Sequence, residues 1–163
     1  MKIAFFDTKP CDKAEAASGF DGACSFANDT PNGINSSRSH LLQWPCKLNL
    51  VPRIAPYFDN ADLLIAADCA AYICKNFHSD FMRERVTLTV CPRLNNEEYL
   101  QKLTDIIVLN DIKTITSVQI DACRCYETEK NIKLAITKSG KSISYQSICV
   151  STDGEITDVK KIY

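Results

Sequence analysis

The chain has 163 residues, of which 45% are hydrophobic and 24% charged, and its formal net charge is -1. This composition is ordinary for one soluble globular domain, and it contains no basic stripe of the kind that binds nucleic acid. No apolar run is long enough to span a membrane and the N-terminus lacks a signal-peptide pattern, so we expect a cytoplasmic protein with no nucleic-acid or membrane partner. Nine cysteines in such a chain indicate metal ligands or redox thiols rather than a disulfide framework.

Residues 1–40 are expected to form an irregular N-terminal arm. The opening MKIAFF is compatible with a short strand, but the sequence from Ala14 to Ser39 is rich in Ser, Gly, Asn and Asp and has no sustained periodicity. Such a stretch is typical of loops and connectors. We therefore predict that an α/β domain occupies residues 41–163.

The domain is expected to begin with an extended segment, LLQWPCKLNLVPRIAPYF. Its three prolines exclude a helix. We expect Trp44, Leu48, Leu50 and Phe58 to pack onto the core, and the stretch around Leu48 is compatible with a strand.

From residue 61 onward, strand-like apolar runs alternate with segments of helical periodicity. Strands are predicted over residues 61–69, 86–90, 114–120 and 145–152. Helices are predicted over residues 70–82, from Asn95 or Asn96 through the stripe that ends at Ile107, and over residues 127–138. This alternation predicts a three-layer α/β domain, Rossmann-like or flavodoxin-like, with a mainly parallel sheet.

Cysteines follow three of the predicted strands. Cys69 ends the first, Cys91 follows the second, and Cys123 and Cys125 follow the third. Because the carboxyl ends of parallel strands meet at one edge of a sheet, we expect these four residues to gather there. Rigidly held thiolates are the ligands that an iron–sulfur cluster or a zinc ion requires. All four are therefore predicted as cofactor and metal ligands.

Other reactive side chains receive structural interpretations. Cys46, Cys74 and Cys149 lie within predicted elements and are interpreted as packing residues, because cysteine is also a small apolar residue. His78 is interpreted as a surface or capping residue. Asp68 either caps the following helix or orients the predicted site.

Several segments together resemble a family of bacterial and archaeal iron–sulfur proteins of the 4Fe–4S, or ferredoxin, type. The resemblance rests on QWP…LVP…AP from residue 43 to 56, on AADC ending at Cys69, on CPRL beginning at Cys91 and on the cysteines after the third strand; it covers residues 41–156. It implies a cluster-binding protein that transfers electrons or assists an oxidoreductase, with a redox protein or oxidoreductase subunit as partner. The family's ferredoxin C-x-x-C module is absent from this sequence, and ACRCYE stands where the family has V-P-C-C-G-G.

Two other functions fit the same cysteines. A thiol/disulfide redox protein would use one as a low-pKa thiolate and another as its resolving partner. A degenerate, non-catalytic partner domain would have kept the fold and lost the cluster, in keeping with the missing module and the altered ACRCYE. Zinc is the alternative metal for four thiolates. No residue is predicted to be catalytic.

Overall fold

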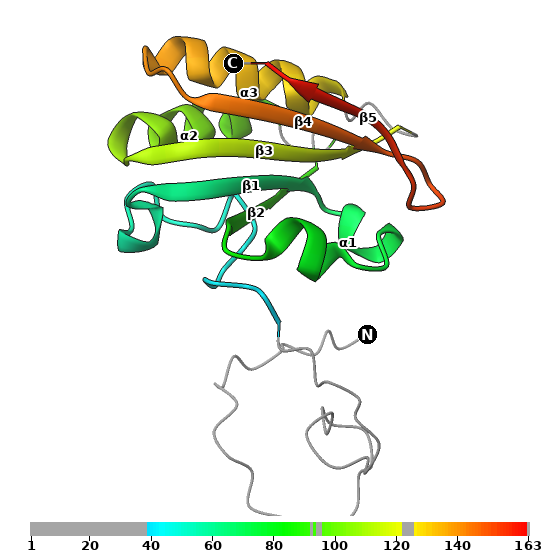
Figure 1. Ribbon diagram of the computed structural model, residues 1–163. Helices are drawn as coiled ribbons and strands as arrows, with labels where there is room; N and C mark the ends of the chain where they lie inside the picture. The colour runs from blue at the N-terminus through cyan, green and yellow to red at the C-terminus, as the bar shows by residue number, and fades with distance from the viewer. Residues whose placement is uncertain (1–38, 92, 94–95, 122–125, 163) are drawn as a thin grey trace, which may run out of the picture. The chain divides into compact units, whose positions relative to one another are not determined.

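The computed structural model describes residues 39–163, apart from 92, 94–95, 122–125 and 163 (Figure 1). Residues 39–163 cluster into one unit. The predicted irregular arm and its short strand lie outside the described residues, apart from the last two positions of the arm.

Strands and helices alternate along the described chain, which confirms the predicted α/β pattern. The elements are β1 (Ala61–Ala67), α1 (Ala70–Ile73), β2 (Val86–Val90), α2 (Asn96–Leu109), β3 (Ile112–Ile120), α3 (Tyr126–Ser139), β4 (Ser144–Val150) and β5 (Ile156–Lys161). Two short helical turns, Pro56–Phe58 and His78–Met82, precede β1 and β2 respectively.

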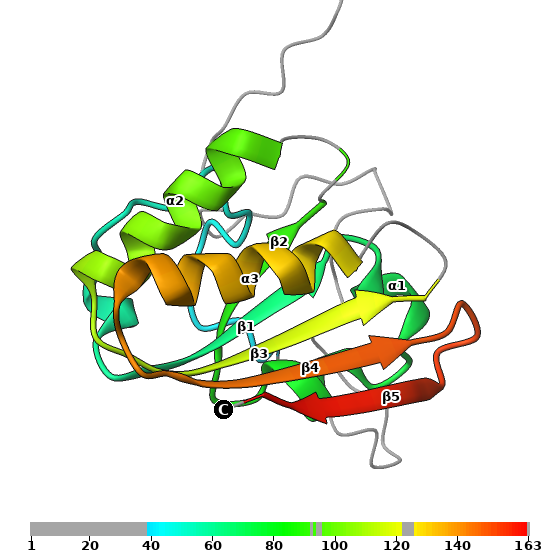
Figure 2. The same ribbon diagram turned by 90° about the horizontal axis from the view of Figure 1, so that it is seen from above.

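The strands form one sheet in the order β2-β1-β3-β4-β5. All neighbours are parallel except β5, which runs antiparallel to β4. Helices α2 and α3 lie side by side over one face of this sheet, and α1 lies over the other (Figures 1 and 2). The result is a three-layer domain with a mainly parallel sheet, as the sequence predicts.

Apolar residues on both faces of the central strands explain this layering. In β1, Leu63 and Ile65 belong to the core cluster beneath α2 and α3, whereas Leu64 and Ala66 belong to the cluster on the α1 side. All four are fully buried. A parallel strand covered by helices on both faces needs such a continuous apolar run rather than an alternating one.

The two long helices form where the apolar period predicts them. In α2, Leu103, Ile106 and Ile107 are fully buried, and in α3 Ile132 is fully buried. Gly140, with φ of 68°, follows the last residue of α3 in the left-handed conformation that ends many helices. Burial of these stripes accounts for most of the stability of helices of this length.

The helix predicted over residues 70–82 is wrong as one continuous element. Helix α1 ends at Ile73, because Cys74 has an extended backbone with ψ of 110°. A turn through Lys75 and Asn76 follows, and a π-helical turn then covers His78–Met82. Phe77 and Phe81 are nevertheless buried, although no continuous helix runs through the segment.

The extended segment before β1 packs less completely than predicted. Leu48 and Phe58 are buried, but Trp44 is 79% exposed and Leu50 68% exposed, so the packing predicted for the latter two is wrong. A single parallel bridge joins Lys47 to Thr89 in place of a strand. The sequence pattern does not predict strand β5, which is rich in polar residues.

Candidate functional site

Main-chain hydrogen bonds hold the carboxyl ends of the strands at one level. The N–H of Asp68, just after β1, donates to the carbonyl of Val90 at the end of β2 over 2.9 Å. The N–H of Asp121, just after β3, donates in the same way to the carbonyl of Val150, at the end of β4, over 2.9 Å. The four parallel strands thus share one edge, which we call the carboxyl edge.

Two of the four predicted ligands stand at the carboxyl edge. Cys69 lies two residues beyond β1 and is exposed, and Cys91 directly follows β2 and is half-buried. Because β1 and β2 are neighbours, the two loops that carry these cysteines are adjacent. Cys123 and Cys125 lie outside the described residues; β3, which precedes them, is the other neighbour of β1.

The remaining described cysteines differ in burial. Cys74 is 7% exposed and packs in the α1-side core, as expected for a structural residue. Cys46 and Cys149 are half-buried thiols. The exposure of Cys69 distinguishes it from all three.

The carboxyl edge contains the point where the chain's crossovers change face. The connection from β1 to β2 passes through α1, whereas the connections from β2 to β3 and from β3 to β4 pass through α2 and α3 on the opposite face (Figure 2). The switch therefore falls between β1 and β3. Open α/β sheets bind their ligands in the crevice at such a point. Asp68 and Cys69 begin the loop on one side of it.

Asp68 forms an ion pair, and of its two predicted roles, helix cap or orientation of the site, the structure does not show the cap. Its Oδ2 accepts a hydrogen bond from Nζ of Lys47, and its Oδ1 is buried with no hydrogen-bond partner among the described residues. Cys69 occupies the cap position of α1 and makes no side-chain capping bond there. Lys47 is 21 residues away in sequence, so no local pattern identifies it as the partner.

The turn from β4 to β5 is held against α1 on one side of the carboxyl edge. The N–H of Ser151 donates to the carbonyl of Glu155 over 2.8 Å, which closes the turn. Gly154 then lies so close to α1 that a Cβ there would stand 2.7 Å from the carbonyl oxygen of Ile73. The turn from β4 to β5 thus has a defined position against α1, the helix that follows Cys69.

Within the described residues, no group of three or more His, Cys, Asp or Glu side chains is arranged to hold a metal ion. Cys123 and Cys125 lie outside those residues. His78, interpreted as a surface or capping residue, accepts a hydrogen bond at Nδ1 from the N–H of His40 over 3.4 Å, in an exposed position.

The described part of the chain also contains no helix that is long and apolar enough to cross a membrane.

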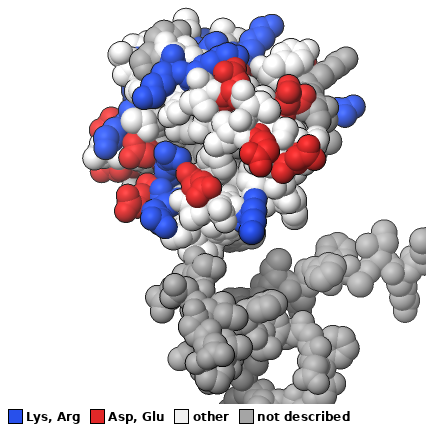
Figure 3. Space-filling model, turned by 45° about the vertical axis from the view of Figure 1, so that its right-hand side comes forward, with Lys and Arg blue, Asp and Glu red and all other residues white. Residues whose placement is uncertain are grey.

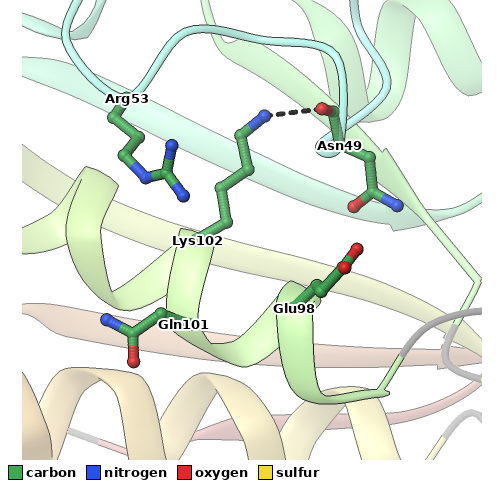
Figure 4. A pocket seen from close by; sticks show the side chains of 5 residues that line it. All are labelled: Asn49, Arg53, Glu98, Gln101 and Lys102. Atoms are coloured by element: carbon green, nitrogen blue, oxygen red, sulfur yellow. Dashed lines mark hydrogen bonds between the residues drawn. The ribbon is translucent and has the colours of Figure 1, made fainter.

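A separate pocket, which the sequence did not predict, lies between α2 and the segment before β1 (Figure 4). Its volume is about 360 Å³, and its lining contains none of the predicted ligands; it consists of Asn49, Arg53, Glu98, Gln101 and Lys102. Lys102 donates to the carbonyl of Asn49 over 2.6 Å, and Nε of Arg53 donates to Asp105 over 2.7 Å. Burial and the neighbouring Arg53 lower the pKa of Lys102. The protein's own groups thus already bind both cations.

Acidic and basic side chains are interspersed on the face shown in Figure 3. Neither sign forms a continuous field on that face. A surface of this kind gives little long-range attraction for a strongly charged partner.

Comparison with known proteins agrees with the observed architecture. The sequence profile of a family described as "Rossmann-like domain" matches residues 55–163, from the turn before β1 to the end of β5 and beyond. A protein of Archaeoglobus fulgidus described as uncharacterized is 24% identical over 121 residues, which are 74% of this chain and 86% of that protein. No solved structure matches the chain.

Proposed function

The chain belongs to the Rossmann-like domain family, and from that premise we propose that it is a redox protein that binds an iron–sulfur cluster or a metal at the carboxyl edge of its sheet. The observation that carries the proposal is the placement of Cys69 and Cys91 after two neighbouring parallel strands whose ends are joined by the bond from Asp68 to Val90. The resemblance of residues 41–156 to 4Fe–4S proteins supports the same assignment. Cys123 and Cys125, which follow β3 in sequence, complete the proposed ligand set.

The chemistry of the two described cysteines suits this role. A ligand thiol must reach the metal, so the exposure of Cys69 and the half-burial of Cys91 favour ligation over packing. Each follows a strand of the paired sheet, which determines where its loop begins. A cluster held by four thiolates would supply one-electron redox chemistry.

The neighbouring ion pair has a proposed electrostatic role. Thiolate ligands bring negative charge to the carboxyl edge, and the ion pair of Lys47 and Asp68, which has no net charge, places a fixed dipole beside that edge. Asp68 holds the ammonium group of Lys47 in place at the end of β1. The potential of a cluster depends on such local charge and on burial, so this pair is proposed to influence the potential of the site.

The proposal includes a partner and a compartment. A redox site of this type needs a protein that donates or accepts its electrons, and we propose a redox protein or an oxidoreductase subunit. A reducing compartment such as the cytoplasm suits unpaired thiols, of which Cys46, Cys74 and Cys91 are examples among the described residues.

The test is anaerobic purification of the full chain, followed by analysis of iron, acid-labile sulfide and zinc and by visible absorbance. We expect a broad charge-transfer band with matching iron and sulfide, lost in Cys69→Ser and in Cys91→Ser. Cys149→Ser is the matched control, because Cys149 is a half-buried thiol of β4 outside the proposed ligand set.

The other outcomes discriminate among the alternatives. Zinc in place of iron would keep the ligand set and remove the electron-transfer role. A colourless, metal-free protein after reconstitution with iron and sulfide would overturn the proposal. In that case a reversible disulfide between cysteines of the carboxyl edge would identify a thiol redox protein, and its absence a domain that has lost its cofactor.

A further inference from the structure

Strand β5 forms one edge of the sheet among the described residues. It is the last strand in the order, and within the described part of the chain its single neighbour is β4 (Figures 1 and 2). All six of its residues are exposed, including the apolar Ile156 and Val159. An open edge presents unpaired N–H and C=O groups that can pair with another strand.

The pairing with β4 determines which backbone groups of β5 remain available. The N–H of Ile162 donates to the carbonyl of Tyr145 over 2.8 Å. Hydrogen-bonded and non-hydrogen-bonded pairs alternate along an antiparallel ladder, so Lys160 and Asp158 also direct their backbone groups toward β4. Val159 and Lys161 direct theirs toward the open edge.

Like charges restrict how β5 can pair with a copy of itself. In a symmetric antiparallel pair the central residue lies opposite its own copy, so a centre at Asp158 or at Lys160 would set two like charges opposite each other. A pair centred on Lys161 would place two lysines opposite each other. A pair centred on Val159 avoids this repulsion and gives the longer overlap.

Charge complementarity favours the pair centred on Val159. In that register Asp158 of each copy lies opposite Lys160 of the other, in non-hydrogen-bonded positions where opposing side chains are closest. Asp158 and Lys160 already form an ion pair over 2.8 Å within one chain, so they share a face of the strand. In the dimer, the two ion pairs would form a ring of four charges of alternating sign. On the opposite face of the strands, Val159 of one copy would contact Val159 of the other.

We propose that two copies of this chain associate through β5, antiparallel and centred on Val159, to form a continuous sheet across a two-fold axis. This interaction surface is independent of the proposed metal site. Two six-residue strands make a small interface, so the dimer is expected to be weak and to dissociate on dilution.

The test is sedimentation velocity of the full chain, in reducing buffer so that intermolecular disulfides do not form, from about 1 µM to several hundred µM. We expect the wild-type mass to rise with concentration toward twice that of the monomer. Asp158→Lys and Lys160→Asp should each weaken association about tenfold or more, since each sets like charges opposite each other. The double variant Asp158→Lys/Lys160→Asp should recover association to within about threefold, because the ring of charges is restored with its signs exchanged.

Lys130→Asp is the matched control, since Lys130 is exposed on α3 and its reversal changes the net charge by the same amount as Lys160→Asp. It should leave association unchanged, and circular dichroism should show that all variants are folded. A wild-type chain that stays monomeric over the whole range would overturn the proposal. So would a dimer whose dissociation constant is the same in Asp158→Lys as in the wild type.

Discussion

The N–H of Asp68 donates to the carbonyl of Val90 over 2.9 Å, and the residues that follow these two are Cys69 and Cys91. One backbone hydrogen bond thus joins two loops that are 22 positions apart in the sequence and that each carry a cysteine. The two cysteines therefore lie in adjacent loops, and their ligand chemistry is best tested together.

Thiol reactivity should follow exposure in the metal-free protein. We expect iodoacetamide to modify the exposed Cys69 at least about tenfold faster than the buried Cys74, because alkylation requires an accessible thiolate. Burial, and then the negative charge of Asp80, raise the pKa of Cys74 above its ordinary 9.0, so its rate should still increase at more alkaline pH. Timed alkylation with peptide mass spectrometry measures both rates; in denaturant they should become equal. Equal rates in the folded protein would contradict the prediction.

Gly154→Ala should destabilise the protein more than Gly140→Ala. Both glycines have positive φ, 86° and 68°, so each substitution carries backbone strain of about 1–2 kcal/mol. A Cβ at Gly154 would also stand 2.7 Å from the carbonyl oxygen of Ile73, whereas nothing lies within 4 Å of one at Gly140. We expect a loss of about 3 kcal/mol or more for Gly154→Ala. Urea denaturation of the two variants checks this, and equal losses would show that the turn moves freely away from α1.

Asn110→Ala should cost about 2–3 kcal/mol in the free energy of unfolding. The buried amide of Asn110 donates to the carbonyl of Arg53 over 2.7 Å and to that of Ile106 over 2.8 Å. It joins the end of α2 to the segment before β1, and its removal leaves buried polar groups unpaired. Asp111→Ala, at the exposed neighbouring position, should change stability by less than about 0.5 kcal/mol. Chemical denaturation of both variants measures the difference. A loss of stability in Asn110→Ala no larger than in Asp111→Ala would contradict the prediction that Asn110 stabilises the contact between α2 and the segment before β1.

Glu129 should make stability depend on acidic pH. Burial opposes its ionisation, but the hydrogen bond and charge of Lys133, with hydrogen bonds from Ser147 and Gln119, outweigh burial and lower the pKa of Glu129 below its ordinary 4.5. A lowered folded-state pKa means that the carboxylate stabilises the protein above about pH 4.5, and that this contribution is lost as pH falls through the folded-state value.

Glu129→Gln tests this dependence. It should lower the free energy of unfolding by about 1 kcal/mol at pH 7 and by progressively less as pH falls through the lowered folded-state pKa and the wild-type carboxyl becomes protonated. Glu98→Gln, at an exposed position of α2, is the control and should show no such difference. Denaturation curves at several pH values give the comparison. A deficit in Glu129→Gln that is constant with pH would assign the effect to packing.

Local pattern predicted the elements whose burial follows a simple period. The apolar runs of β1 and β2 and the apolar stripe of α2 are predicted correctly, because the residues that each element buries follow a period within its own sequence. The local pattern gives the wrong result where contacts with a distant segment determine burial or strand pairing. Trp44 reads as a core residue and is exposed, and β5 reads as polar chain and pairs with β4 because β4 offers an edge.

The candidate site shows the same division. The positions of Cys69 and Cys91 at strand ends follow from the sequence, because a strand that loses its apolar run ends there. The ion pair between Asp68 and Lys47 joins residues 21 positions apart, so only the folded chain brings it to the carboxyl edge. The pocket beside Lys102 is likewise assembled from two segments separated in sequence.

By itself, then, the sequence determined the alternation of strands and helices, the mainly parallel sheet and the cysteines that follow its strands, because these depend on hydrophobic period and on the geometry of crossovers. Only the tertiary structure decided the strand order β2-β1-β3-β4-β5, the face covered by each helix and the open edge of β5. These depend on which apolar surfaces pack together across long stretches of chain, and no local window of sequence contains both partners.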